Sequence, residues 1–474
     1  MLAQNILTTF LSRVAILLIA LASSVVLARF LGPEARGVYA LVLFLPEIAG
    51  IFSLLGFEQA NVVYAGLEPQ KRQVLVWHST IIAAVFGGGI AILGFVLLAL
   101  DLSGIQSLLR GPLWLYGVAL SIVPFALATE YFRAILRGMN RIFMLNVLDI
   151  GLKVAGLFLI LIVVGWLGLE VVGAVWAEFS LTLLAMAVTV ALLGYLGMLG
   201  PPKFERSLLG RTTRFALPAH GNTVMSFLNY RVDQIFIVAW LPPQDLGFYV
   251  LAAGLAERLW IPTGAVANAL LPHLANSPNR DPDLSAVIAR HVMVWVGIAC
   301  LLLFGLADLL VNVLYSSAFA GTVAPLRWML LGVFSLSIGR ILVAELLARK
   351  KPHYTFWASS TAAFLNIVGN YFLIPRMGIS GAALASSASY TLLSFMLVRF
   401  YLKETGGTWD LLRPRMTDVQ VYISLWGAGK NTIFPRINHS KSSGDQLTQA
   451  STSRAATWST RNLRQGQEPP DDAK

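Results

Sequence analysis

Charged residues are scarce in this chain of 474 residues. Asp, Glu, Lys and Arg together make up 12% of the sequence, whereas hydrophobic residues make up 57%. Soluble chains have about 25% charged residues, so this composition does not suit a protein surrounded by water. The single cysteine, Cys300, excludes an internal disulfide. The sequence therefore predicts an all-α polytopic membrane protein whose solvent is the bilayer.

Motifs for catalysis are also absent. The six histidines show no His-Glu-x-x-His spacing, and no Gly-x-Ser-x-Gly sequence occurs. We expect a protein that is not an enzyme and needs no cofactor. A membrane glycosyltransferase is a weak alternative, since it would need acidic metal ligands or a large external loop. The net charge of +11 would suggest nucleic acid in a soluble protein, but here the basic residues lie in short loops, so we expect no nucleic-acid partner.

Apolar runs of about the roughly 20 residues that a bilayer requires recur along the chain. We predict about twelve membrane spans, at residues 6–28, 38–57, 74–100, 113–129, 147–165, 171–196, 215–240, 248–271, 287–306, 323–348, 354–374 and 379–402. They divide into an N-lobe (1–199) and a C-lobe (215–403), joined by a basic cytoplasmic linker (200–214). After residue 403 the apolar pattern ends, and we expect residues 404–474 to form a disordered cytoplasmic tail.

The loops differ in basic charge. One alternating set is rich in basic residues, namely Lys71, Arg72, Arg133, Arg137, Arg141, Lys203, Arg206, Arg211, Arg214, Arg280, Arg290, Arg349, Lys350 and Lys351. The other set holds Arg29, Arg36, Arg110, Arg327 and Arg376. Loops rich in Lys and Arg face the cytoplasm. We therefore expect a multi-pass protein of the cytoplasmic (inner) membrane with both termini inside.

The two halves share a short repeat. Residues 31–39 (LGPEARGVY) match residues 241–249 (LPPQDLGFY) at a shift of about 210, and the same shift places Glu47 on Glu257. Six spans in each half make parallel repeats, which are related by an axis along the membrane normal. In such transporters the substrate site lies between the halves near the midplane, and one half rocks against the other.

The repeated sequences carry a family resemblance. Residues 27–39 resemble the start of the polysaccharide-export flippases of the MATE-like (MOP) superfamily, and similar matches follow at residues 136–141, 233–237, 247–249, 261–262 and 271–274. The resemblance covers about residues 1–415. It implies a V-shaped, alternating-access transporter of two six-helix lobes. It also implies a substrate, a polyprenyl-diphosphate-linked oligosaccharide for surface polysaccharide, and leaves other polysaccharide assembly proteins as potential partners.

Cations at bilayer depth are the candidate substrate ligands. A charged side chain there costs about 2.5–3.5 kcal/mol on insertion scales and is expected to face a cavity or a partner. Arginine also pairs well with phosphate. The candidates for lining a cavity that binds a diphosphate are Arg13, Arg231, Arg340, Lys153 and Arg258. The alternative for each is an ion pair that closes a helix contact, and Lys153 and Arg258 lie near span ends.

Carboxylates at the same depth are candidates for coupling to an ion. Glu47, Glu178, Asp233 and Glu257 could carry H⁺ or Na⁺, or could form structural salt bridges. The repeat relation of Glu47 and Glu257 favours a shared structural role. Intramembrane asparagines such as Asn222, Asn229, Asn366 and Asn370 more often link helices than contact sugar.

Two rivals share the predicted fold. A MATE-type multidrug exporter would favour acidic residues in its cavity, which the basic candidates argue against. A peptidoglycan-precursor flippase would be expected to have further spans, and the sequence after Lys403 contains none.

Overall fold

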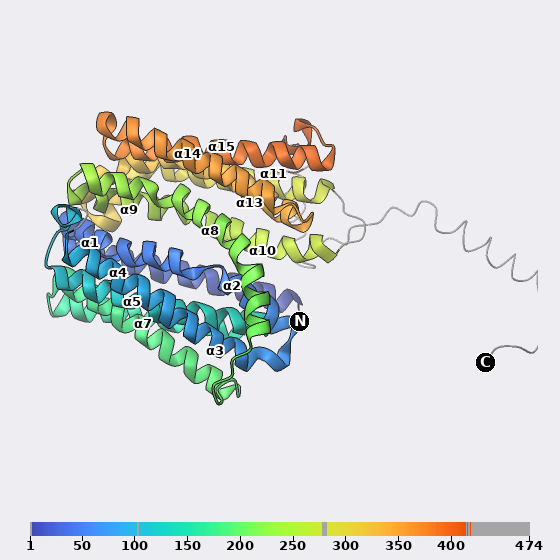
Figure 1. The fold of residues 1–474 in the computed structure, drawn as a ribbon. Helices are drawn as coiled ribbons and strands as arrows, with labels where there is room; N and C mark the ends of the chain where they lie inside the picture. The colour runs from blue at the N-terminus through green and yellow to red at the C-terminus, as the bar shows by residue number, and fades with distance from the viewer. Residues whose placement is uncertain (1, 102–103, 277–281, 414, 416–417, 419–474) are drawn as a thin grey trace, which may run out of the picture. The chain divides into compact units, whose positions relative to one another are not determined.

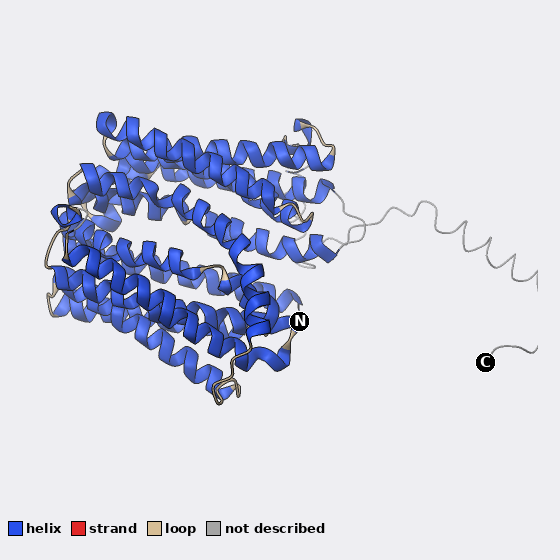
Figure 2. Ribbon diagram, viewed as in Figure 1, coloured by secondary structure: helices blue, strands red, loops and turns tan. Residues whose placement is uncertain are grey.

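The structure, a computed structural model, describes residues 2–101, 104–276, 282–413, 415 and 418. Residues 1–414 form one compact unit, and the second unit, residues 415–474, is described at 415 and 418 alone. The described residues form helices and no strand (Figure 2). Most of the predicted tail lies outside the described residues. Its first part is structured, because α15 continues to Thr405 and a 3-10 turn follows.

The first half of the chain contains seven α-helices with short 3-10 and π segments between them. They are α1 (Leu2–Leu54), α2 (Phe57–Leu67), η1 (Pro69–Lys71), α3 (Arg72–Ile82), η2 (Ala83–Gly87), α4 (Gly88–Ala99), η3 (Ile105–Leu108), α5 (Leu113–Gly138), α6 (Ile142–Ile160), η4 (Leu161–Trp166) and α7 (Glu170–Tyr195).

The second half follows the same plan. Its elements are α8 (Arg206–Trp240), α9 (Pro243–Glu257), α10 (Trp260–Asn276), α11 (Pro282–Gly305), α12 (Ala307–Tyr315), η5 (Ser317–Thr322), α13 (Val323–Ala348), α14 (Pro352–Met377), α15 (Ile379–Thr405) and η6 (Trp409–Leu412). The predicted linker is partly helical, because residues 206–214 form the first turns of α8.

Eight helical segments of the described chain are long and apolar enough to cross a membrane. They cover most of every predicted span except the seventh, eighth and eleventh, and one segment, Ser12–Leu54 of α1, covers both the first and the second. The three exceptions lie in α8, in α9 with α10, and in α14, whose lengths or polar residues keep them below this criterion. The count of twelve stays a prediction.

A break at Gly32 divides α1 into two arms. Its φ of 73° and ψ of 177° are not helical, and glycine reaches positive φ without a steric penalty. Pro33 follows directly and begins the second arm. The predicted turn between the first two spans therefore lies at this glycine.

The helices of the two halves lie in two groups (Figure 1). The first half, in blue and green-blue, surrounds α5, and the second half, in green to orange, is built on the packing of α13 and α14 against α15. Helix α8 begins beside α2 and continues to α9 and α14. The start of α1 and the end of α15 lie at one end of the unit, opposite the α8–α9 turn.

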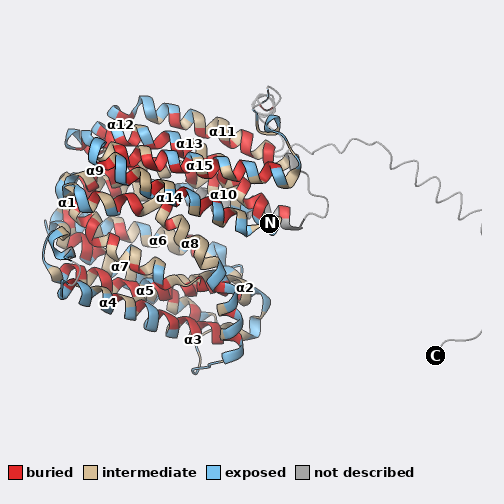
Figure 3. Ribbon diagram, turned by 45° about the horizontal axis from the view of Figure 1, so that its top comes forward, coloured by how far each residue is buried: buried red, intermediate tan, exposed pale blue. Residues whose placement is uncertain are grey.

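Exposed residues lie along the outer helices (Figure 3), and many of them have large hydrophobic side chains. Examples are Trp166, Leu301 and Phe364, which are 82%, 75% and 69% exposed. Soluble monomers rarely expose large continuous apolar patches. This surface therefore faces lipid, and the protein is a multi-pass integral membrane protein.

The repeated sequences of the two halves contact each other. A Cβ atom at Gly37 would overlap the carbonyl of Pro243, and a Cβ atom at Gly247 would overlap the carbonyl of Pro33. Because Pro33 and Pro243 are themselves repeat-related, the contact is reciprocal, as at a twofold axis. The backbones of α1 and α9 thus touch at a point that needs glycine on both sides.

Buried polar side chains join α8 to α9 and α15 inside the second half. Asp233 is 1% exposed and accepts hydrogen bonds from the Tyr249 hydroxyl and from the Ser386 hydroxyl (2.9 Å). Nearby, Asn229 accepts a hydrogen bond from Ser389 at 2.8 Å. We call this set the Asp233 hub, in which the Asp233 carboxylate and the Asn229 side-chain oxygen accept hydrogen bonds from hydroxyl groups of neighbouring helices.

The same hub extends to α14. The Asn366 amide donates to the Asn229 carbonyl at 2.7 Å, and the Asn370 amide donates to the Asn366 side chain at 2.7 Å. Asn229 and Asn366 therefore link helices, as expected, whereas the Asn370 amide bonds within α14.

We predict that Gly37→Ala and Gly247→Ala each destabilise the protein, by about 1–3 kcal/mol, because the added methyl group forces α1 and α9 apart. The thermal unfolding midpoint of the purified protein in detergent checks this. Gly50→Ala, in the same arm of α1 with nothing near its Cβ position, is the control and should not lower the midpoint. Unchanged midpoints for both interface variants would contradict the contact.

We also predict that Asp233→Ala destabilises the protein by about 1–3 kcal/mol, because it leaves the buried Tyr249 and Ser386 hydroxyls without their acceptor. Thermal unfolding measures the loss, and Glu34→Ala, at an exposed position of α1, is the control. A variant that unfolds like the wild type but transports abnormally would instead make Asp233 an ion-coupling residue.

Candidate functional site

A pocket of about 380 Å³ gathers three of the predicted cations. Arg13 of α1, Arg231 of α8 and Arg340 of α13 line it together with Glu257 at the end of α9. Its other walls are aromatic and small side chains, namely Tyr230, Trp260, Ile261, Gly264, Ala265 and Asn268. We call it the cationic pocket. It draws on helices of both halves.

Arg231 is held by two carboxylates. Its two terminal nitrogens donate to Glu257 at 2.9 and 3.3 Å, and its Nε donates to Glu47 at 3.2 Å. A guanidinium with this fork geometry suits paired oxygens. The sequence left an ion pair that closes a helix contact as the alternative for Arg231. The structure forms such pairs, with both repeat-related glutamates.

Arg340 is held by an aromatic ring. Its guanidinium lies 4.6 Å from the ring centroid of Trp260, and the indole nitrogen donates to the Val333 carbonyl at 3.0 Å. Trp260 also packs against Tyr230 and Tyr390, with ring centroids 5.8 and 5.4 Å away. This cation–π contact fixes the position of Arg340 without neutralising its charge.

Two of the three cations lack a counter-ion. Within the part of the chain that the structure describes, neither Arg13 nor Arg340 forms an ion pair. With Arg231 already bound to two carboxylates, these two guanidinium groups give the pocket its capacity for an anion.

A second, polar pocket of about 410 Å³ adjoins the first. It shares Tyr230, Gly264, Asn268 and Arg340 with the cationic pocket and adds Asn222, Ser226, Thr355 and Ser359 among its lining residues. The Asn222 side-chain oxygen is buried without a hydrogen-bond partner. Amides and hydroxyls at such a surface suit a ligand rich in hydroxyl groups.

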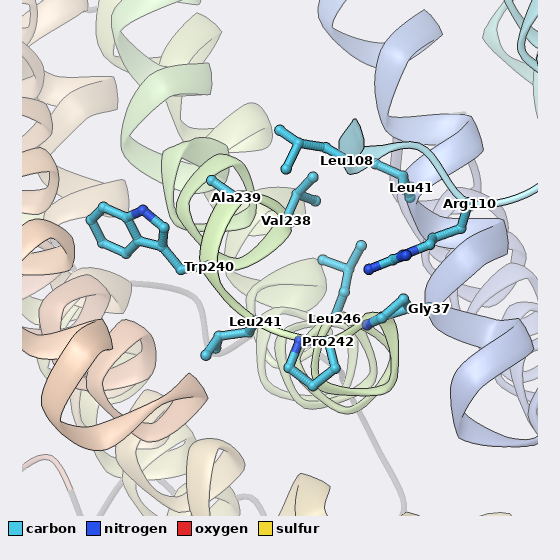
Figure 4. Close-up of a pocket in the computed structure, with 11 residues that line it drawn as sticks. Gly37, Leu41, Leu108, Arg110, Val238, Ala239, Trp240, Leu241, Pro242 and Leu246 are labelled. Atoms are coloured by element: carbon cyan, nitrogen blue, oxygen red, sulfur yellow. The ribbon is translucent and has the colours of Figure 1, made fainter. Parts of the chain in front are cut away.

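A third pocket lies at the α8–α9 turn and shares no lining residue with the other two (Figure 4). Its volume is about 330 Å³, and Gly37, Arg110, Trp240, Pro242 and Leu246 are among its lining residues. The guanidinium of Arg110 points into it (Figure 4). The touching backbones of α1 and α9 border this pocket.

The remaining predicted residues are not among the lining residues of the three pockets. Lys153 is exposed on α6, and its charge acts on the half-buried Glu178 of α7. Arg258 donates to the Gly254 carbonyl at 2.7 Å. Asp233 belongs to the hub. Glu47 reaches the cationic pocket through its contact with Arg231.

Sequence reasoning missed the aromatic wall of the cationic pocket. Trp260 and Tyr230 lie in apolar spans where helix rotation is not fixed by periodicity, and their closeness to Glu257 and Arg231 in the sequence was the one usable signal. No group of three His, Cys, Asp or Glu side chains in the described residues could hold a metal ion.

Known proteins with similar sequence or fold are transporters or biosynthesis proteins. Residues 26–324 match the family described as polysaccharide biosynthesis protein. No curated protein sequence matches the chain. The fold is similar to that of the lipid II flippase MurJ in an inward closed conformation, with a TM-score of 0.66 and 14% identity, over 90% of this chain and 93% of that chain.

Two transporters of another kind have a similar fold. An inward-facing multidrug resistance MATE family transporter of the MOP superfamily has a TM-score of 0.64 and 17% identity, over 83% of this chain and 97% of that one. The Vibrio cholerae MATE transporter VcmN in its bent form has a TM-score of 0.59 and 13% identity, over 85% and 96%. At these identities the likeness establishes the fold. Since the matching family model spans more than half of the sequence, the chain belongs to the polysaccharide biosynthesis protein family, with the fold of the MOP-superfamily transporters.

Proposed function

We propose that this protein is a flippase that moves polyprenyl-diphosphate-linked oligosaccharide across the cytoplasmic membrane for surface polysaccharide synthesis. The observation that carries the proposal is the cationic pocket, in which Arg13, Arg231 and Arg340 converge beside a polar pocket. A diphosphate that crosses about 30 Å of hydrocarbon needs cations along its path. The guanidinium groups supply them, and the polar pocket suits the sugar.

The transport cycle follows from the two groups of helices. In the proposed cycle the diphosphate enters from the leaflet at the end of the unit that holds the start of α1 and the end of α15, and the basic loops support a cytoplasmic position for this end. The arginines bind it between the halves, and the prenyl chain stays in lipid. Rocking of the halves about the α1–α9 contact then exposes the pocket to the opposite side.

The main rivals differ in the charge that they require. A multidrug exporter for cationic drugs needs an acidic cavity, and three arginines at this pocket oppose that. A peptidoglycan-precursor flippase also carries a diphosphate lipid, and MurJ has a similar fold. The family description favours a polysaccharide precursor.

We predict that cells lacking the protein accumulate the complete lipid-linked repeat unit and lose surface glycan, because assembly continues while export stops. Analysis of extracted polyprenyl-linked oligosaccharide checks this. Accumulation of lipid-linked peptidoglycan precursor with cell lysis would favour the other flippase. New sensitivity to cationic dyes with no accumulated lipid would favour the drug exporter.

We predict that Arg231→Ala reduces glycan export by about tenfold or more, because a charge-assisted contact to phosphate is worth about 1.5–3 kcal/mol. Surface glycan is measured in the deletion strain at matched amounts of protein in the membrane. Arg327→Ala is the matched control, since Arg327 pairs with Asp308 away from the pocket and should leave export near the wild-type level. Wild-type glycan output from the Arg231 variant would remove this residue from the mechanism.

An ion gradient, of H⁺ or Na⁺, is a proposed driving force, and Glu178 is the candidate that fits it best. Glu257 and Glu47 are bound to Arg231, and Asp233 belongs to the hub, whereas Glu178 forms no ion pair with another described residue. We predict that Glu178→Gln makes export in membrane vesicles insensitive to the proton and sodium gradients. Unchanged dependence on either gradient would exclude this role.

A further inference from the structure

One guanidinium joins two glutamates that the internal repeat relates. Arg231 contacts Glu47, which α1 of the first half carries, and Glu257, which α9 of the second half carries. The sequence aligns these glutamates at the same shift that aligns Gly37 with Gly247. Arg231 itself has Leu21 at the corresponding place in the first half. Two symmetric anions therefore share one cation.

The two glutamates do not hold Arg231 equally. Glu257 accepts two hydrogen bonds from the terminal nitrogens, at 2.9 and 3.3 Å, and its side chain is 21% exposed. Glu47 accepts one from Nε, at 3.2 Å, and its side chain is 45% exposed. A bidentate contact is stronger and more directional than a single one. Glu47 is therefore the partner that an incoming anion displaces more easily.

We propose that Glu47 is an internal substitute for the substrate's diphosphate, which occupies Arg231 in the empty protein and is displaced when a diphosphate binds. This inference rests on the proposed function. Displacement transfers Arg231 from a carboxylate of α1 to the ligand, while Glu257 keeps the guanidinium oriented. The same exchange breaks an ion pair between the two halves, so ligand binding and release of α1 become one event.

The exchange also gives the site a selectivity. A monoanion that replaced Glu47 would trade one negative charge for another at Arg231 and gain little. A diphosphate brings further charge, which Arg13 and Arg340 can neutralise because neither has an ion-pair partner within the described part of the chain. Competition from Glu47 thus lowers the affinity for every anion, and a diphosphate offsets this through Arg13 and Arg340, whereas a simple carboxylate does not.

The test is binding of farnesyl diphosphate to the purified full chain in detergent, measured by calorimetry and compared with farnesyl monophosphate. Glu47→Gln keeps the size of the side chain and removes its charge. We expect it to bind farnesyl diphosphate about fivefold more tightly than the wild type, since the competing ion pair is lost. We expect monophosphate affinity to rise by a similar factor, because the same ion pair is lost, and farnesyl diphosphate to remain the tighter ligand.

Glu257→Gln is the matched control, because it removes the repeat-related charge at the same cation. It leaves Glu47 as the sole carboxylate on Arg231, so its gain in affinity should be smaller than that of Glu47→Gln. If the two variants gained equal affinity for farnesyl diphosphate, Glu47 would have no role beyond its negative charge, and the proposal would be overturned. An unchanged or lower affinity in Glu47→Gln would also overturn it, since a structural ion pair has that signature.

These outcomes separate the inference from the function on which it rests. If the wild type binds farnesyl diphosphate and Arg231→Ala does not, while Glu47→Gln behaves as the wild type, the cationic pocket binds the ligand and the role of Glu47 is refuted. If the wild type does not bind farnesyl diphosphate at all, the diphosphate site itself is refuted, and with it the exchange.

Discussion

The contact of α1 with α9 at Gly37 and Gly247 sets the positions of Glu47 and Glu257, and through them the ion pairs of Arg231. Each glycine meets the carbonyl of the proline that precedes the other, so the two helices meet with twofold symmetry. Glu47 and Glu257 lie ten residues beyond their respective glycines, about 15 Å along each helix at 1.5 Å per residue. They are therefore equally far from the contact, and Arg231 reaches both. A side chain at either glycine would separate the helices and the two carboxylates together.

Polar groups in this apolar protein serve two purposes. Those of the Asp233 hub join α8, α9, α14 and α15 through hydrogen bonds between neighbouring helices. Those of the cationic pocket include two guanidinium groups, Arg13 and Arg340, that form no ion pair with another described residue. A cation at bilayer depth is expected to face a partner or a cavity. The two arginines therefore support the proposal that the pocket receives an anion.

The sequence predicted the fold class and most of the elements because bilayer thickness sets the length of an apolar run. It also located the repeat, since a glycine and a proline are required wherever two backbones touch or turn. It chose Arg13, Arg231 and Arg340 from their depth in the apolar runs. It ranked Lys153 and Arg258 below them because these two lie near span ends. It could not show that the three arginines converge, because nearly all positions in these helices are apolar and the pattern does not fix their rotation.

The ion-pair partners of Arg231 were harder to predict from the sequence than the arginine itself. Arg231 has Asp233 two residues away and Glu257 across a turn, and Glu47 is distant in sequence. Two residues along a helix point to different faces, so Asp233 turns into the hub while Arg231 turns to the pocket. The partner from α1 depends on how the two halves meet, which no local pattern encodes. The repeat relation of Glu47 and Glu257 was the one sequence signal for it.

The ion pairs break the symmetry of the two halves, because the first half has no counterpart of Arg231. If both halves supplied an arginine, each glutamate would have its own cation, and an anion would find both sites closed. With Arg231 on one side and Leu21 on the other, one cation serves two carboxylates and is fully held by neither. An unpaired guanidinium in a helix bundle within the bilayer is costly. Glu257 holds Arg231 through two hydrogen bonds, whereas Glu47 is half-exposed and accepts one hydrogen bond. Arg231 therefore stays paired and in place while its contact with Glu47 can be exchanged for a ligand.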